Sequence, residues 1–200
     1  MLAARALKRC WSRLARSLSW LLLLGAAALA CVGAGAYRVS GVLCQPPRRL
    51  AIPAISLDQP IVSGGWQEQD LGSARLMVPV VNTQHPTWFS SSGCVGQRDN
   101  MVIFGHSSLN GNPAIFRNLD KLTIGQRIEV YGYNTGSWYV ITNRVIIRES
   151  GATLRDRIEN GKLLGHTETR QLTLVTCWPY PDNTYRLVVI ANPGYGSNPK

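Results

Sequence analysis

Charged residues are scarce in this 200-residue sequence, and acidic residues are absent from its first 49 positions. Only 16% of the residues are charged and 45% are hydrophobic, a composition that excludes a disordered chain and a long coiled coil. The formal net charge is +10, but residues 50–200 hold thirteen basic and eleven acidic residues, a balance of +2. The basic excess therefore belongs to the N-terminal segment, and the case for a nucleic-acid-binding domain loses its main support.

The N-terminal segment has the pattern of a membrane anchor. Residues 17–37 contain no charged residue, and residues 1–16 contain five basic residues and no acidic one. About 20 apolar residues in a helix span a hydrocarbon core of roughly 30 Å. We therefore expect a cytoplasmic basic segment (1–16) and one transmembrane helix (17–37), with all later residues outside the cytoplasm. Ala28-Leu29-Ala30 also fits a signal-peptide cleavage site, or with Cys31 a lipoprotein site, and both alternatives give residues 50–200 the same location.

Three of the five cysteines, Cys44, Cys94 and Cys177, follow the apolar segment. Because three is an odd number, at least one thiol is free or pairs with another chain. The sequence is compatible with a bridge between Cys44 and Cys94, which would leave Cys177 free. A free thiol in an oxidising compartment calls for an explanation, and the simplest one is that it packs as a small hydrophobe.

Short strand patterns dominate the rest of the sequence, which begins with a polar, proline-containing linker at residues 38–49. We expect a domain over residues 50–192 and a frayed tail at 193–200. Many short strands with turn signals and little helix predict a mostly-β barrel or sandwich. The expected elements are a proline-broken edge strand at 50–62, a long loop at 81–99, strands at 100–104, 127–133, 138–147, 171–177 and 184–191, and helical turns at 112–122 and 153–160.

Three residues with complementary chemistry lie at or near the ends of apolar strands. His106 and Cys177 each follow an apolar run, and Arg186 interrupts another. A nearby imidazole or cation lowers the pKa of a thiol and so favours the nucleophilic thiolate, while a guanidinium can stabilise an oxyanion. The three side chains therefore match a thiol-dependent acyl-transfer site. The simpler alternatives are a loop histidine and a surface arginine paired with Asp182.

These residues lie in segments that closely resemble the sortases, the cysteine transpeptidases of bacterial cell surfaces. The histidine region reads NMVIFGHSSLNGNPAIFRNLDKLTIGQRIEVY, and the cysteine and arginine region reads LTLVTCWPYPDNTYRLVVIA. IPAISLDQPIV is similar to the opening strand of the same domain, so the resemblance runs in chain order from about Ile52 to Ala191. The Trp-Pro-Tyr-Pro sequence after Cys177 is closer to sortase class D or E than to class A or B.

The resemblance implies a fold, an activity and a set of site residues. The implied fold is the eight-stranded sortase β-barrel with short helices, here preceded by the transmembrane helix. Cys177 would be the nucleophile that attacks the Thr–Gly bond of an LPXTG-type sorting signal and forms a thioacyl enzyme. His106 would be the acid/base, Arg186 would hold the substrate and stabilise the oxyanion, and Thr176 would place a hydroxyl near the substrate.

The resemblance also implies partners, and it implies neither a cofactor nor a metal. The partners would be surface proteins with a C-terminal LPXTG-like signal and an amine acceptor such as a peptidoglycan precursor. No acidic cluster resembles the calcium site of some sortases, and the three histidines lack zinc spacing.

Two other functions are compatible with parts of the sequence. The segment Ser91-Ser92-Gly93-Cys94-Val95, with His85 before it and Arg98 after it, resembles the cysteine motif of L,D-transpeptidases. A catalytically silent, membrane-tethered domain that binds peptide is the other alternative. In L,D-transpeptidases the arginine follows the cysteine more closely, and the rest of this sequence does not match them. The presence of all three sortase residues argues against the silent domain.

Overall fold

The computed structural model describes residues 44–70 and 75–195 of the chain. The predicted basic segment (1–16) and the predicted membrane helix (17–37) lie outside the described residues. Within the described part, no helix is both long enough and apolar enough to cross a bilayer.

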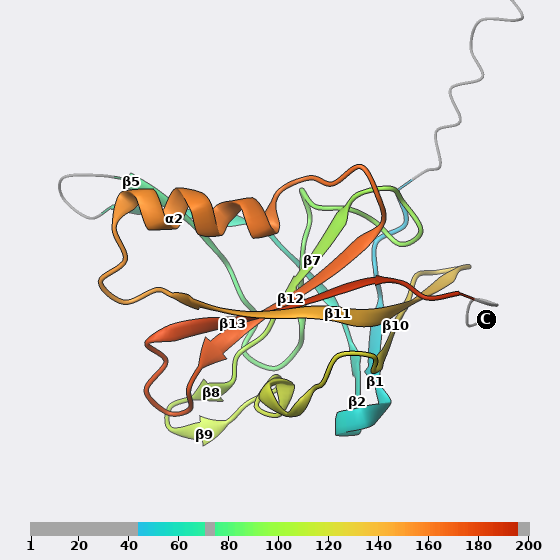
Figure 1. Ribbon diagram of the computed structural model, residues 1–200, viewed down its shortest axis with the longest axis horizontal. Helices are drawn as coiled ribbons and strands as arrows, with labels where there is room; N and C mark the ends of the chain where they lie inside the picture. Colours follow the sequence, from blue (N-terminus) through green and yellow to red (C-terminus); the bar gives the residue numbers. More distant parts are fainter. Residues whose placement is uncertain (1–43, 71–74, 196–200) are drawn as a thin grey trace, which may run out of the picture. The chain divides into compact units, whose positions relative to one another are not determined.

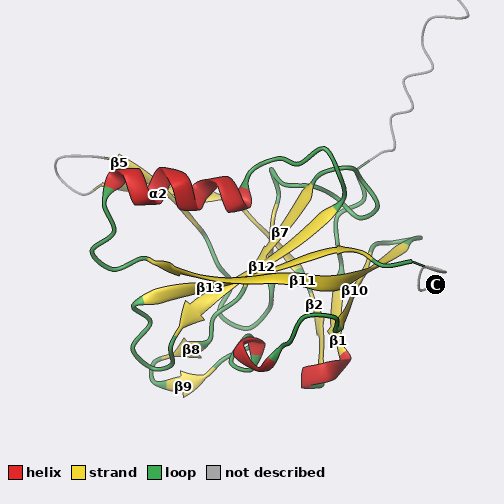
Figure 2. Cartoon of the chain, viewed as in Figure 1, coloured by secondary structure: helices red, strands yellow, loops and turns green. Residues whose placement is uncertain are grey.

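Short strands make up most of the described chain, and helices are few (Figures 1 and 2). The strands are β1 (Arg49–Ile52), β2 (Leu57–Pro60), β3 (Val62–Gly64), β4 (Trp66–Asp70), β5 (Arg75–Pro79), β6 (Thr87–Phe89), β7 (Asn100–Phe104), β8 (Ser108–Leu109), β9 (Asn112–Pro113), β10 (Arg127–Tyr131), β11 (Gly136–Arg148), β12 (Gln171–Trp178) and β13 (Tyr185–Pro193). The helices are α2 (Leu154–Gly161) and the 3₁₀ turns η1 (Pro53–Ile55), η2 (Leu119–Lys121) and η3 (Lys162–Leu164).

Nine of these strands form one sheet in the order β2-β1-β10-β11-β13-β12-β7-β6-β3. Its two outer strands, β2 and β3, are separated in sequence only by Ile61, so the edges of the sheet come together there. Ile61 N–H donates to the carbonyl of Arg48 (2.8 Å), and Val62 N–H donates to the carbonyl of Pro86 (3.0 Å). Counted as one bent strand, β2 and β3 give a nearly closed sheet of eight strands. The predicted mostly-β, barrel-like fold is confirmed.

The central strands are buried on both faces. Along β7, Met101 and Ile103 belong to the main core, whereas Val102 and Phe104 belong to a second apolar cluster on the opposite face. Residues of η3 pack against this second cluster. Because β7 pairs in parallel with β12, burial on both faces is expected for these strands.

Several local predictions are confirmed. The strands predicted at 100–104, 171–177 and 184–191 are β7, β12 and β13, and residues 127–147 form the β10–β11 hairpin. The helix predicted at 153–160 is α2. Thr153 caps it by accepting a hydrogen bond from the Asp156 N–H, and the Asp156 carboxylate accepts one from the Thr153 N–H.

Two local predictions are wrong in part. In the segment 50–62 the break at Pro53 is as predicted, because Pro53 starts η1, and β2 lies at the edge of the sheet, but β1 lies inside the sheet between β2 and β10 and is not an edge strand. The segment 81–99 is not entirely loop, because it contains β6, a short, buried strand that pairs with β3 and β7. The β4–β5 hairpin has no counterpart among the predicted elements.

Candidate active site

Cys177 lies near the end of β12, and its neighbours on both sides are the other two predicted site residues. In the antiparallel pair β12–β13, Cys177 is directly opposite Arg186. Side chains of directly opposed residues lie on the same face of a sheet, with Cβ atoms about 5 Å apart. The strand pairing therefore fixes the thiol and the guanidinium beside each other.

His106 reaches the same place from the other side of β12. The parallel pairing of β7 with β12 ends at Phe104 opposite Val175, and the next residue, Gly105, donates its N–H to the Val175 carbonyl (3.1 Å). His106 follows at once, at the level of Cys177. The adjacent strands β12 and β13 thus carry Cys177 and Arg186, and the chain that leaves β7 carries His106.

Gly105 allows this approach because it has no side chain. A Cβ at this position would lie 2.5 Å from Cδ2 of Phe116, whose ring is fully buried. The Phe116 N–H donates to the His106 carbonyl (2.8 Å). The buried ring therefore packs directly against the residue that precedes His106 and holds the start of the loop.

Thr176 is buried, and its hydroxyl donates to the Gly105 carbonyl at 2.8 Å. This bond extends the contact between β12 and the chain leaving β7 by one residue. The hydroxyl proton of Thr176 is therefore used in a hydrogen bond within the protein. The two residues that this bond joins, Thr176 and Gly105, directly precede Cys177 and His106.

A cavity of about 650 Å³ opens over these residues, and His106, Thr176, Cys177 and Arg186 all line it. One wall comes from the β4–β5 hairpin and the residues after it, and another comes from α2 and η3. In Figure 1, β5 and α2 lie next to each other along one side of the sheet. The wall residues are largely apolar and include Trp66, Met77, Val78, Val80, Val81 and Leu164. The cavity combines a largely apolar wall with a few polar side chains, which is the composition expected of a binding site.

Two arginines that line the cavity, Arg157 and Arg186, differ in their hydrogen-bond partners. Arg157 of α2 donates to the Glu149 carboxylate (2.7 Å) and to the Glu149 carbonyl (3.1 Å). Arg186 makes only long contacts, to the carbonyls of Asn183 (3.5 Å) and Tyr185 (3.4 Å). Among the described residues, no carboxylate forms an ion pair with Arg186, and the alternative pairing with Asp182 is not observed. The guanidinium is therefore available to an incoming carbonyl oxygen.

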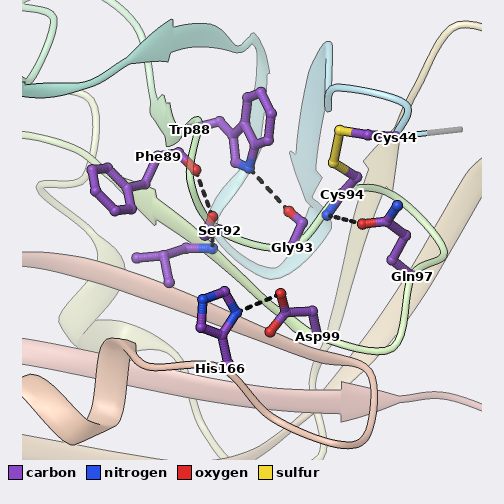
Figure 3. Close-up of a disulfide and its surroundings, with 10 residues drawn as sticks. Cys44, Trp88, Phe89, Ser92, Gly93, Cys94, Gln97, Asp99 and His166 are labelled. Atoms are coloured by element: carbon purple, nitrogen blue, oxygen red, sulfur yellow. Dashed lines mark hydrogen bonds and ion pairs between the residues drawn. A yellow bond between two sulfur atoms is a disulfide. The ribbon is translucent and has the colours of Figure 1, made fainter.

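Cys44 and Cys94 form a disulfide, with their Cα atoms 5.4 Å apart (Figure 3). This leaves Cys177 as the free cysteine of the described residues. Cys94 is buried at 4% exposure and has no thiol to offer, which rules out the L,D-transpeptidase interpretation of its motif. Trp88 supports the same loop by donating its indole N–H to the Gly93 carbonyl (3.0 Å).

A polar network joins this loop to the segment after α2. Burial alone would raise the pKa of Asp99, but hydrogen bonds from His166, Asn100 and Thr167 outweigh it and hold that pKa below its usual value. The Asn100 amide donates to the carbonyls of Leu163 and Gly165, both at 3.1 Å. Figure 3 shows His166 pointing at Asp99 beneath the disulfide loop. These hydrogen bonds hold the segment around Leu164 in place, and Leu164 is one of the residues that line the cavity.

The residues that form the cavity walls were not predicted from the sequence. Trp66 and Met77 belong to a hairpin whose first strand reads WQEQD, which has no apolar alternation to reveal it. Glu149 and Arg157 lie on different elements, and only the folded chain brings them together. Within the described residues, no group of three His, Cys, Asp or Glu side chains gathers in a way that could hold a metal ion.

Fold and cavity together define a mostly-β domain in which a thiol, an imidazole and a guanidinium share one cavity. The family model described as Sortase domain matches residues 50–194, and the chain belongs to the sortase family. The resemblance found in the sequence is thereby confirmed. Because this family consists of transpeptidases, the match supports an enzyme. A search of curated proteins finds no match.

Solved structures of sortases share the fold. Sortase C1 from Streptococcus agalactiae is 23% identical with a TM-score of 0.55, over 75% of this chain and 68% of its own. Sortase C-1 from Actinomyces oris is 22% identical with a TM-score of 0.57, over 74% of this chain and 73% of its own. A lid mutant of sortase A from Corynebacterium diphtheriae is 23% identical with a TM-score of 0.57, over 80% of this chain and 75% of its own.

Proposed function

We propose that this protein is a membrane-anchored sortase that cleaves an LPXTG-type sorting signal between Thr and Gly and joins the Thr carbonyl to an amine. The observation that carries the proposal is the position of Cys177, opposite Arg186 on β13 and next to the chain that leaves β7 and carries His106. All three line one cavity with a largely apolar wall. Structural packing alone does not explain why a free thiol, an imidazole and an arginine that has no carboxylate partner among the described residues share one cavity.

The first half-reaction forms the thioacyl enzyme. The Cys177 thiolate attacks the Thr carbonyl carbon, a sulfur–carbon bond forms, and the carbonyl electron pair moves to oxygen, where Arg186 donates hydrogen bonds. The intermediate collapses, the carbon–nitrogen bond to Gly breaks, and His106 in its protonated form gives its proton to the leaving amine.

The second half-reaction transfers the acyl group. His106, now neutral, takes a proton from the incoming amine as that amine attacks the thioester carbon. Arg186 stabilises the second oxyanion, the carbon–sulfur bond breaks, and the Cys177 thiolate is regenerated. The products are a new amide and the starting enzyme. Thr176 supports both steps by tying Gly105 to β12, and it lines the cavity beside the substrate.

The proposed partners are surface proteins with a C-terminal LPXTG-like signal and an amine acceptor such as a peptidoglycan precursor. The proposed location is the cell membrane, with a single span at 17–37 and the sortase domain outside the cytoplasm. The charge pattern of residues 1–37 supports this orientation. The Cys44–Cys94 disulfide also supports it, because such bonds persist in oxidising compartments. The class D or E assignment stays a prediction.

The test is turnover of LPXTG-like peptides with an amine acceptor, followed by mass spectrometry of the transfer product and of the acyl-enzyme. Cys177→Ala should abolish both species. Arg186→Lys should lower kcat about 10²–10³-fold although the charge is kept, because lysine cannot reproduce the forked donor. The matched control replaces Cys44 and Cys94 with alanine and should stay within a few-fold of wild type at low temperature. Wild-type protein that binds the peptides but never cleaves them would instead be a silent binding domain.

A further inference from the structure

Asn183 connects the loop after His106 with the loop between β12 and β13. Its side-chain oxygen accepts a hydrogen bond from the Ser107 hydroxyl (3.3 Å), and its side-chain nitrogen donates to the Ser108 hydroxyl (3.2 Å) and to the Pro181 carbonyl (2.9 Å). Ser107 and Ser108 are the two residues directly after His106. One amide therefore holds the chain that carries the imidazole, although 76 residues separate Asn183 from Ser107.

The main-chain carbonyl of Asn183 contacts Arg186, the third residue of the candidate site. The Asn183 carbonyl accepts the long hydrogen bond from the Arg186 guanidinium (3.5 Å). Its N–H donates to the Pro179 carbonyl (2.7 Å), which closes the loop after Cys177. The backbone of Asn183 is left-handed (φ +60°), a conformation that asparagine and glycine adopt more readily than other residues.

Asparagine is matched to this position by its hydrogen-bonding groups. Ser107 is buried at 3% exposure, so its hydroxyl needs a partner inside the protein, and the amide oxygen supplies one. The amide nitrogen donates to the Pro181 carbonyl and the Ser108 hydroxyl. Aspartate would keep the acceptor but would turn a second oxygen toward that carbonyl and lose the donor.

From these contacts we infer that Asn183 is a positioning residue that sets His106 and Arg186 relative to Cys177. The inference rests on the proposed transpeptidase function and deepens it. The amide fixes the two residues after the imidazole, and the carbonyl of the same residue limits the direction of the guanidinium. Loss of the Asn183 side chain therefore releases the two residues after His106, while the main-chain carbonyl that contacts Arg186, the thiol and the cavity wall all remain.

The loop between β12 and β13 is also held by contacts that do not involve Asn183. The effect of removing the Asn183 side chain can therefore be distinguished from the effect of displacing the whole loop. The Tyr180 hydroxyl donates to the Gly111 carbonyl (2.6 Å), and the Arg117 guanidinium lies over the Tyr180 ring at 4.1 Å. These contacts hold the loop to the β8–β9 region independently of Asn183. Removing the Asn183 amide should therefore leave the loop in place while releasing Ser107 and Ser108.

The decisive variant is Asn183→Gly in the full chain, which keeps the left-handed backbone and removes only the amide. Displacing catalytic groups by about 1 Å can cost about 10²-fold in rate. We expect kcat for an LPXTG-type peptide to fall about 10- to 100-fold, with KM within about threefold. Asn183→Asp should lose activity as well. The double variant with Ser107→Ala should lose no more than Asn183→Gly, because both changes break the same contact.

The matched control is Asn110→Gly. Asn110 is also left-handed (φ +50°) and exposed, and it lies in the β8–β9 turn outside the proposed site. This variant makes the same chemical and conformational change and should keep kcat within about twofold. Wild-type kcat in Asn183→Gly, or equal losses in Asn183→Gly and Asn110→Gly, would overturn the inference.

A second measurement does not depend on the substrate. The pH dependence of the rate of Cys177 alkylation is sensitive to an imidazole held close to the thiol. Asn183→Gly should move this profile toward that of His106→Ala, whereas Asn110→Gly should reproduce the wild-type profile. If wild type transfers no peptide, the proposed function fails, and this profile still decides the positioning role. A wild-type profile in Asn183→Gly would reject that role.

Discussion

Replacing Cys44 and Cys94 with alanine opens a covalent ring whose ends are 50 residues apart in sequence. A ring of this length restricts the unfolded chain by about 4 kcal/mol at 25 °C on the loop-closure estimate. Because Cys94 is buried, alanine at that position also leaves a small void, which costs on the order of 1 kcal/mol. The double variant should therefore lose about 4–5 kcal/mol of unfolding free energy.

Urea denaturation of the two proteins side by side measures this loss. With a slope of about 2 kcal/mol per molar urea, the midpoint should fall by about 2 M. Neither Cys44 nor Cys94 lies on β7, β12 or β13, so the rate of Cys177 alkylation in the absence of urea should equal that of wild type. Thiol titration of unfolded wild type should rise by two thiols on reduction, which checks that the bridge was present.

A midpoint shift below about 0.3 M, with an unchanged slope and the bridge present in wild type, would refute the reasoning. It would mean that the ring does not restrict the unfolded chain. A shift of the expected size together with lost Cys177 reactivity would show instead that the disulfide loop supports the site itself.

Two further predictions concern other buried positions. Gly105→Ala places a Cβ 2.5 Å from the Phe116 ring and should cost about 1–3 kcal/mol in urea denaturation and reduce kcat; adding Phe116→Leu should restore part of the stability, and an unchanged midpoint in Gly105→Ala would contradict the packing. Burial raises the pKa of Tyr139 from 10.0 to about 12. The neutral phenol therefore contributes about 3 kcal/mol of stability that is complete below pH 10 and is lost as the pH rises through about 12, and Tyr139→Phe should remove that alkaline loss.

The C-terminal half of the fold was predictable because its strands are long and apolar and its turns carry clear signals. The hairpin of β10 and β11 and the strands β12 and β13 follow from local patterns of this kind. β6 was not predictable, because three residues form a strand only through their pairing with β3 and β7. The β4–β5 hairpin was missed because its polar first strand has no alternation.

Some parts of the candidate site were also predictable from the sequence, and others were not. His106, Cys177 and Arg186 could be picked out because each lies at or within an apolar strand, where a reactive or charged side chain stands out. The link from Asn183 to Ser107 could not, since it depends on how two loops distant in sequence meet. The bridge between Cys44 and Cys94 was compatible with the sequence, and the folded chain brings the two cysteines together.

The disulfide also decides how mechanical load enters the domain. A pull on the chain before Cys44 is shared at that residue between the backbone toward β1 and the covalent bond to Cys94. Without the bond, the pull would act on β1 alone, whose hydrogen bonds to β10 and β2 would have to break before the load reached deeper strands. With the bond, part of the load passes through Cys94 to the chain that enters β7, so less of it acts on the hydrogen bonds of β1. Tension applied before Cys44 thus leaves the pairing of β7, β12 and β13 in register.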